Sequence, residues 1–212
     1  MKNSTAQIYE YHHSTARAED FSILKEARGK LFKFLVGQNK MVLDIGCRDG
    51  ALTSFFVEGN KVLGVDVDSI SLLRAKERLN IETTILDLHG NWAEISGRSF
   101  DCVVAGEVLE HVYYPEEVIK KVRGHLNSGG VFIGSVPNPF NFKNRLRYLL
   151  GSKKGTPLSD PTHINHFHIN ELRSVLGKYF SKVEIIGLGR WVKLARWFPG
   201  WCSFDLVFVA RD

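Results

Sequence analysis

Met41–Gly50 reads MVLDIGCRDG, a short apolar run followed by one acid and a glycine-bearing turn. The apolar residues predict a buried strand over Met41–Ile45, and Gly46 and Gly50 predict a tight turn after it. A helical pattern is expected from Ala51 to Glu58. Strand, glycine turn and helix in this order are typical of the first unit of a nucleotide-type site. The glycines let a ligand approach the backbone, and a helix start offers free N–H groups.

Strands and helices alternate along most of the chain, which predicts βαβ units and a mostly parallel sheet. The last two expected strands are joined by too short a segment for a crossover helix, so we expect them to pair antiparallel. A turn is expected at 127–130. Further strands are expected at 61–66, 81–86, 100–105, 131–136, 182–188 and 204–210, and helices at 17–36, 69–79, 115–126, 142–150 and 170–179.

Composition is that of an ordinary globular protein, with 212 residues, 44% hydrophobic and 24% charged. We therefore expect a single domain over residues 1–212. The three cysteines are widely spaced and match neither a zinc site nor a disulfide framework, which favours a reducing compartment. The N-terminus lacks the apolar core of a signal peptide, and no apolar run reaches membrane-spanning length. The expected location is cytoplasmic.

The net charge of +5 is unevenly distributed. Residues 1–138 carry 16 Lys and Arg against 18 Asp and Glu, a balance of −2, whereas residues 139–212 carry 12 against 5, a balance of +7. This excess suggests a surface that faces an anionic partner: a phosphate-bearing substrate, nucleic acid or a membrane. A solvated basic surface without a partner is equally compatible with the numbers.

Acids stand at or just after the ends of three successive expected strands: Asp44, Asp66 and Asp87. Ligands of open parallel sheets bind beyond the carboxyl ends of the strands. An acid in the position of Asp66 suits hydrogen bonding to ribose hydroxyls, and Asp87 is placed to reach an adenine amino group. The turn lacks the G-x-G-x-x-G pattern of dinucleotide sites and the lysine of a Walker motif, so both of those classes are disfavoured.

These motifs together resemble those of class I S-adenosylmethionine-dependent methyltransferases, in particular the methyltransferase type 11/23-like and ubiquinone-biosynthesis O-methyltransferase-like groups. The similarity rests on VLDIGCRDG, VLGVD, LDL, FDCVVAGEVLEHV, VFIGSVPN and HFHINELRSVL, in this order over roughly residues 40–180. It implies a Rossmann-like α/β fold with a seven-stranded, mostly parallel sheet, an antiparallel last strand and helices on both faces. It also divides the chain into an N-terminal arm and helix (1–38), a cofactor-binding core (39–137), an insertion or lid (138–168) and a C-terminal substrate-side half (169–212).

The resemblance also implies the residues that hold the cofactor, S-adenosylmethionine. Asp44 and the glycine turn would contact its methionine portion, Asp66 its ribose, and Asp87 with Leu88 its adenine. Arg48 departs from the family pattern, which usually has a third glycine there. If this residue has positive φ, arginine costs roughly 1 kcal/mol, which would weaken the site. The full expected set is Asp44, Ile45, Gly46, Cys47, Gly50, Asp66, Val67, Asp87, Leu88 and Glu107.

The string Glu107-Val108-Leu109-Glu110-His111 is the strongest candidate for catalysis. If it opens a helix, its two carboxylates and its imidazole share one face and could ligate magnesium, manganese or zinc. It resembles the E-x-x-E-H metal motif of ubiquinone and small-RNA methyltransferases, with His166 as the expected further ligand and His163 and His168 as alternatives. The same string looks widespread in metal-free members of the family, where His111 would be a general base or a supporting residue.

The predicted function is S-adenosylmethionine-dependent methyl transfer, directed to oxygen on a small-molecule, sugar or lipid-linked acceptor. One alternative is a metal-dependent 2′-O-methyltransferase acting on RNA 3′ ends, and another is a cofactor-binding module without catalysis. The insertion and the segment Arg190–Trp201 carry aromatic and basic side chains that would overhang the acceptor pocket. They would suit an apolar or sugar-stacking surface, phosphate contacts or peripheral membrane contact.

Overall fold

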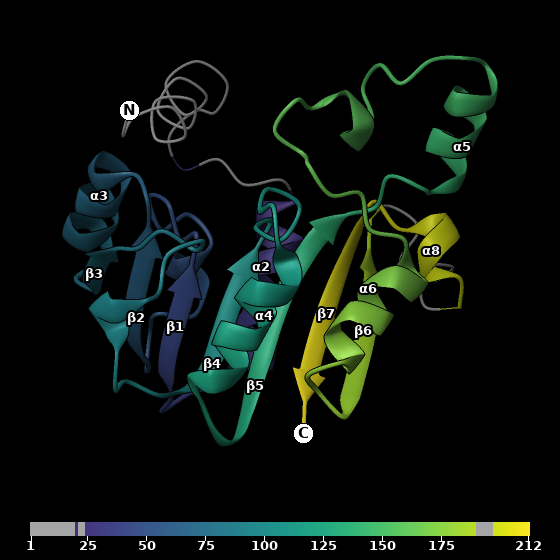
Figure 1. Ribbon diagram of the computed structural model, residues 1–212. Helices are drawn as coiled ribbons and strands as arrows, with labels where there is room; N and C mark the ends of the chain where they lie inside the picture. The colour runs from purple at the N-terminus through teal and green to yellow at the C-terminus, as the bar shows by residue number, and fades with distance from the viewer. Residues whose placement is uncertain (1–19, 21–23, 190–196) are drawn as a thin grey trace. The chain divides into compact units, whose positions relative to one another are not determined.

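The computed structural model describes residues 20, 24–189 and 197–212 (Figure 1). Its seven strands follow the order β3-β2-β1-β4-β5-β7-β6. This order confirms the predicted α/β fold with a seven-stranded, mostly parallel sheet. The chain divides into two compact units, 1–100 and 101–212, which we describe separately. Among the described helices, none has the length and apolarity that a bilayer crossing requires.

The first unit is built on three parallel strands whose sequence predictions were accurate. β1 (Met41–Ile45) pairs with β2 (Lys61–Asp66), and β2 pairs with β3 (Glu82–Ile85). The middle of β1 and β2 is apolar and buried, whereas β3 (ETTI) is more polar and more exposed. The helices α2 (Lys25–Val36) and α3 (Ser69–Leu79) belong to the same unit. The carboxyl ends of all three strands therefore lie at one edge.

Asp68 sets the start of α3. Its side chain accepts hydrogen bonds from the backbone N–H groups of Ile70 at 3.0 Å and Ser71 at 3.2 Å. These are two of the N–H groups that a helix start leaves without intrahelical partners. The cap fixes the direction of the chain directly after β2. Asp66 is the last residue of β2, so the cap lies at the same edge of the sheet as Asp66.

The helix predicted from Ala51 to Glu58 is wrong. The structure has a short 3₁₀ turn, η1 (Thr53–Phe55), in its place. Two hydroxyls explain the difference, because Thr53 Oγ1 bonds to Asp44 and Ser54 Oγ donates to the carbonyl of Ala51 at 2.9 Å. Such side-chain bonds compete with the helical backbone pattern. The glycine turn is consequently not followed by an α-helix.

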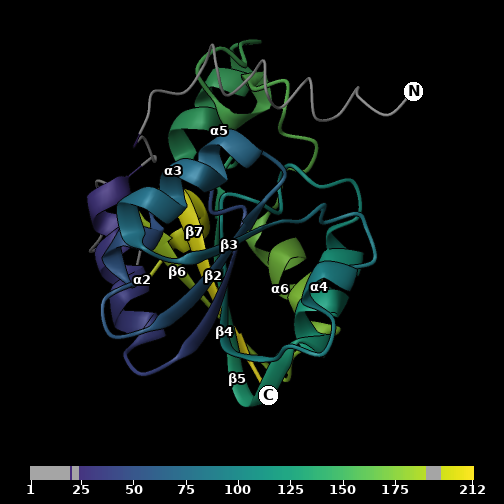
Figure 2. The same cartoon turned by 90° about the vertical axis from the view of Figure 1, so that its left-hand side faces the viewer.

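The second unit contains β4 (Phe100–Gly106), most of which lies in it, and β5 (Leu126–Pro137), β6 (Lys182–Leu188) and β7 (Asp205–Arg211). β7 runs antiparallel to both β5 and β6, which confirms the prediction for the last two strands. The turn predicted at 127–130 is wrong, since these residues belong to β5. The helices α4 (Pro115–Gly124) and α6 (Ile169–Gly177) contact β5 and β6 respectively and lie side by side in both views (Figure 1, Figure 2).

Long connections above the carboxyl ends of β5 and β6 complete the second unit. The connection after β5 forms α5 (Phe142–Leu149) and the 3₁₀ turn η3 (Pro157–Ser159), and α8 (Pro199–Cys202) precedes β7. α5 confirms the short basic helix predicted in the insertion. Most of the segment Arg190–Trp201, including Trp191, lies outside the described residues.

Candidate functional site

Asp44 is a buried carboxylate at the carboxyl end of β1. It is 3% exposed, and its Oδ2 accepts a hydrogen bond from Thr53 Oγ1 at 2.6 Å. Burial raises the pKa of Asp44 from 3.8 to about 7, and the charge of Asp66 adds to this rise, whereas the bond from Thr53 opposes it. A cation bound beside Asp44 would favour its ionised form. This carboxylate therefore suits a positively charged ligand.

The glycine turn after β1 satisfies its own backbone. The N–H groups of Gly46 and Cys47 donate to the carbonyl of Val65, at 2.8 Å and 3.2 Å, and that of Gly50 donates to the Cys47 carbonyl at 2.9 Å. Ala51 N donates to Asp49 Oδ1 at 3.2 Å. The free N–H groups expected from a helix start are thus absent among these residues. The turn offers close approach to its backbone and does not form a phosphate-binding nest.

Arg48 confirms the irregularity that its sequence position suggested. Its φ is +52°, the left-handed region that L side chains enter at a cost. The same conformation directs the Arg48 N–H to Asp66 Oδ2 at 3.0 Å, while Asp66 Oδ1 accepts from Asp68 N at 3.0 Å. One carboxylate at the end of β2 therefore joins the glycine turn to the start of α3.

The remaining expected cofactor residues of the first unit differ in solvent exposure. Asp87 is exposed after β3, its Oδ1 accepting from His89 N at 2.9 Å, and Val67 and Leu88 are partly exposed. Ile45 and Cys47 are both buried, Ile45 completely. Burial also raises the pKa of the Cys47 thiol well above its usual value, with the nearby Asp44 and Asp66 charges adding to it. The edge thus presents acids and close backbone, which fits a cationic sulfonium cofactor better than a polyphosphate.

Glu107 belongs to the second unit and starts a turn directly after β4. The E-x-x-E-H string does not open a helix, because the chain reaches α4 only at Pro115. Glu107 has a φ of +60°, donates its N–H to the Ser135 carbonyl at 3.0 Å and accepts from Ser135 Oγ at its Oε1 at 3.0 Å. Both contacts hold Glu107 against β5.

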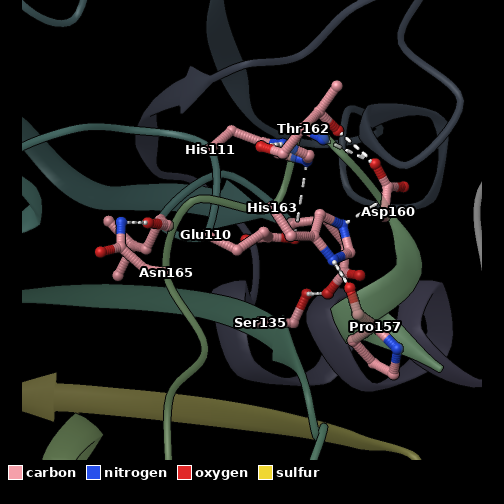
Figure 3. Close-up of polar contacts among 10 residues, drawn as sticks. Glu110, His111, Ser135, Pro157, Asp160, Thr162, His163 and Asn165 are labelled. Carbon is pink, nitrogen blue, oxygen red and sulfur yellow. Dashed lines mark hydrogen bonds and ion pairs between the residues drawn. The ribbon is translucent and has the colours of Figure 1, made fainter. Parts of the chain in front are cut away.

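Three side chains form a compact ligand set in the second unit (Figure 3). One atom from each of Glu110, His111 and His163 lies within 4.8 Å of the others. Glu110 is 1% exposed, and the two imidazole rings meet edge to face at 4.9 Å between their centroids. A carboxylate and two imidazoles are a donor set that manganese, iron or zinc accepts.

Both imidazoles are oriented by backbone carbonyls (Figure 3). His111 Nδ1 lies 3.0 Å from the Thr162 carbonyl and His163 Nδ1 lies 3.1 Å from the Pro157 carbonyl. A carbonyl only accepts, so each Nδ1 carries the hydrogen and each Nε2 of a neutral ring keeps its lone pair. His111 Nε2 lies 3.8 Å from Glu110 Oε1, and His163 Nε2 lies 3.7 Å from Asp160 Oδ2. Lone pairs that face carboxylates at this range call for a proton or a metal cation.

Asn165 explains why residues so distant in sequence meet. Its side-chain amide donates to the carbonyls of Leu109 at 3.1 Å and Val112 at 2.6 Å. The N–H groups of Ile164 and Asn165 also converge on the Glu110 carbonyl, at 2.8 Å and 2.9 Å. The loop that carries His163 is thereby fastened to the turn that carries Glu110 and His111.

The structure brings together a cluster that only partly matches the metal ligands expected from the sequence. His163 stands where His166 was expected, and Glu107 is held at Ser135 instead of joining Glu110. His166 Nε2 is buried and has no hydrogen-bond partner in the described part of the chain. Sequence reasoning missed Asp160 and Thr53. An Asx-type Ser-Asp-Pro turn before the histidines was the available signal for Asp160, and nothing in the sequence pattern marks Thr53.

Comparison with known proteins identifies the family. The model of a methyltransferase domain matches residues 17–179, so the chain belongs to this methyltransferase family. A relative in Mycolicibacterium smegmatis, named "Probable S-adenosylmethionine-dependent methyltransferase", is 29% identical over 147 residues, covering 68% of this chain and 52% of that protein. A ubiquinone biosynthesis O-methyltransferase of Vibrio atlanticus is 36% identical over 124 residues, covering 54% of this chain and 50% of that one.

A solved structure agrees on the fold. The N-methyltransferase NodS of Bradyrhizobium japonicum, in complex with S-adenosyl-L-homocysteine, has a TM-score of 0.68 at 18% identity and covers 99% of both chains. The chain spans about half the length of the first curated relatives that it matches. The chain therefore carries a methyltransferase domain, and its fold is that of solved methyltransferase structures.

Proposed function

We propose that this chain transfers the methyl group of S-adenosylmethionine to an oxygen atom, with a divalent cation held by Glu110, His111 and His163. The convergence of one ligand atom from each of these three side chains within 4.8 Å carries this proposal. A cation bound there would lower the pKa of an acceptor hydroxyl, which is the difficulty that oxygen acceptors pose. The acceptor class that we propose is a small molecule, a sugar or a lipid-linked compound.

The cofactor contacts are part of the same proposal. Asp44 would face the cationic methionine portion, Asp66 the ribose, and Asp87 with Leu88 the adenine. The self-satisfied glycine turn and the raised pKa of Asp44 support this assignment. Because the sulfonium is already activated, positioning of the two reactants supplies much of the rate acceleration.

A metal titration tests the ligand set without any acceptor. The purified chain, treated with chelator and then titrated with Mn²⁺, should bind one equivalent, seen as loss of the free-ion signal in electron paramagnetic resonance. The substitutions Glu110→Gln and His163→Gln should each weaken binding about tenfold or more, since each removes one ligand. The matched control is His125→Asn, whose imidazole bonds to the Lys121 carbonyl within α4. Equal binding by all four proteins would contradict the proposal.

The main alternative without metal assigns general-base catalysis to His111 alone. Its Nδ1–H is held by Thr162, so its Nε2 is free of a proton in the neutral ring and can accept one. Methyl transfer that persists in excess chelator but disappears in His111→Asn would favour this alternative. Transfer lost in chelator and restored by Mn²⁺ would favour the metal.

The acceptor class is tested by transfer from tritiated S-adenosylmethionine. The panel pairs a catechol and a simple sugar with a short RNA and the same RNA ending in a 2′-deoxynucleotide. Label on the small acceptors supports the proposed class. Label on the RNA alone, lost with the 2′-deoxy end, would identify the chain as an RNA 3′-end 2′-O-methyltransferase.

A further inference from the structure

α5, which belongs to the second unit, exposes an apolar face to solvent. Its exposed side chains Phe142, Leu146, Leu149 and Leu150 follow the i, i+4, i+7, i+8 spacing of one helix stripe. Leu149 is 84% exposed and Leu150 is 76% exposed. The buried Asn144 lies on the opposite side of the helix. Aliphatic side chains this exposed in a continuous stripe indicate a surface that is covered by something else.

Cations border this stripe. The stretch 139–159 holds five basic residues and no acid, and Lys143 and Arg145 fall on either side of the apolar positions in a helical projection. In the part of the chain that the structure describes, none of the five takes part in an ion pair. The five basic residues are Lys143, Arg145, Arg147, Lys153 and Lys154.

The segment around α8 extends the same face. Trp197 is 78% exposed, and Phe198, Trp201 and Phe204 are exposed as well. The Arg145 guanidinium lies 4.5 Å from the centre of the Trp201 ring, a cation–π contact that joins α5 to α8. Figure 1 shows α5 and α8 in the same part of the second unit. We call these exposed apolar side chains, together with the five basic residues that border them, the basic–apolar face. Its apolar members are Phe142, Leu146, Leu149, Leu150, Trp197 and Trp201.

Buried asparagines hold the two halves of this face together. Asn138 Nδ2 donates to the Ser203 carbonyl at 2.9 Å and to the Gly200 carbonyl at 3.2 Å. The side-chain amides of Asn141 and Asn144 both donate to the Asn138 carbonyl, at 3.2 Å and 3.3 Å. The exposed side chains are therefore presented on a fixed support, so little ordering is needed when a partner binds.

We propose that the basic–apolar face docks on the surface of an anionic phospholipid bilayer. Leucine and tryptophan side chains of an interfacial helix enter the boundary between headgroups and acyl chains, and bordering lysine and arginine meet the lipid phosphates. Both chemistries are present here in one face. The proposal does not depend on the acceptor or on the metal, because lipid binding is measured without either.

Other occupants fit the face less well. A second copy of the chain would bring five cations against the same five, and like charges oppose such a self-complementary contact. Single-stranded nucleic acid could stack bases on Trp197 and Trp201. It would leave the exposed Leu146, Leu149 and Leu150 uncovered, because aliphatic side chains offer no stacking platform.

Vesicle flotation of the full chain tests the proposal. The protein should float with phosphatidylcholine vesicles that contain phosphatidylglycerol, should float poorly with phosphatidylcholine alone, and should dissociate as salt rises. Tryptophan fluorescence should shift to shorter wavelength on binding. The double substitution Leu149→Gln with Leu150→Gln should lower the partition coefficient about tenfold or more, and Lys153→Gln with Lys154→Gln roughly tenfold at low salt.

The matched control is Ile70→Gln with Leu73→Gln, which removes two exposed aliphatics of α3 in the first unit, 54% and 55% exposed. This variant should bind vesicles like the unmodified chain. Absence of vesicle binding would overturn the proposal. An equal loss of binding in the Leu149/Leu150 variant and in this control would overturn it as well. A dimer that Leu149→Gln dissociates, or RNA binding without vesicle binding, would assign the face to those partners instead.

Discussion

Substitution of Asp44 should change protein stability and the proposed cofactor binding in opposite directions. A carboxyl whose pKa is raised from 3.8 to about 7 in the folded protein binds its proton more tightly there than in the unfolded chain. The free energy of unfolding therefore falls progressively as pH rises from about 4 to 7. Above pH 7 the loss is complete and no longer depends on pH. Asp44→Asn, which can still accept from Thr53, should stabilise the protein by about 1–4 kcal/mol at pH 8 and by less at pH 5.

The same substitution removes the negative charge that we assign to the cationic part of the cofactor. Calorimetric titration with S-adenosylmethionine should show at least tenfold weaker binding, while urea unfolding at the two pH values reports stability. The conservative control is Thr53→Val, which removes the hydroxyl that opposes the rise and should move the pKa of Asp44 further upward. A variant that binds cofactor normally would exclude the proposed role of Asp44.

Two substitutions of Arg48 measure the free-energy cost of a Cβ at positive φ. Arg48→Gly removes both the side chain and the Cβ, whereas Arg48→Ala removes the side chain and keeps the Cβ at φ +52°. The difference between the two variants therefore reports the backbone term. We expect the glycine variant to be the more stable by about 1 kcal/mol in urea unfolding, because glycine enters this region freely. Equal stabilities would show that the turn relaxes around alanine.

At the scale of elements, the side chain of Asp68 caps the N-terminus of α3 and should stabilise this helix. Asp68→Ala removes bonds to the N–H groups of Ile70 and Ser71 and should lower the free energy of unfolding by about 1 kcal/mol. Ser69→Ala, one residue later and inside the helix, serves as the control and should change stability little. Chemical denaturation of the two variants side by side makes the comparison. Equal losses would mean that Asp68 contributes through something other than capping.

Some elements were predicted accurately from the sequence and others were not. β1, β2, α3 and β6 were predicted to the residue, because apolar periodicity and burial agree there with the pairing of neighbouring strands. The failures occurred where side-chain hydrogen bonds override the local pattern. Thr53 and Ser54 convert the expected helix into a 3₁₀ turn, and the glycines at 129 and 130 are accommodated inside β5.

The candidate site was predictable in composition but only partly in geometry. The acids after β1, β2 and β3 were found because parallel strands end at one edge. The choice between His163 and His166 depends on the Asn165 bonds to Leu109 and Val112, which join segments more than fifty residues apart. No local sequence pattern encodes such a contact. The sequence therefore indicated the histidines at 163, 166 and 168, but not which of them lies beside Glu110 and His111.

At the scale of the whole molecule, burial sorts the three cysteines. Cys47 and Cys102 are buried, and Cys202 in α8 is partly exposed. We expect one thiol to react quickly with an aromatic disulfide reagent in the native protein and all three to react in denaturant, because thiolate formation needs solvent. In Cys202→Ser the fast reaction should disappear. Fast reaction of a second thiol would reveal opening of the core around Cys47 or Cys102.

His111 makes its hydrogen bond to Thr162, 51 residues further along the chain, and His163 lies one residue beyond that partner. A cation shared by Glu110, His111 and His163 would thus act as a removable cross-link that closes a long loop of the chain. Ligands that bind only the folded state raise its melting temperature with their concentration. The melting temperature of this protein would then rise with the concentration of the metal ion, whether or not a methyl group is transferred.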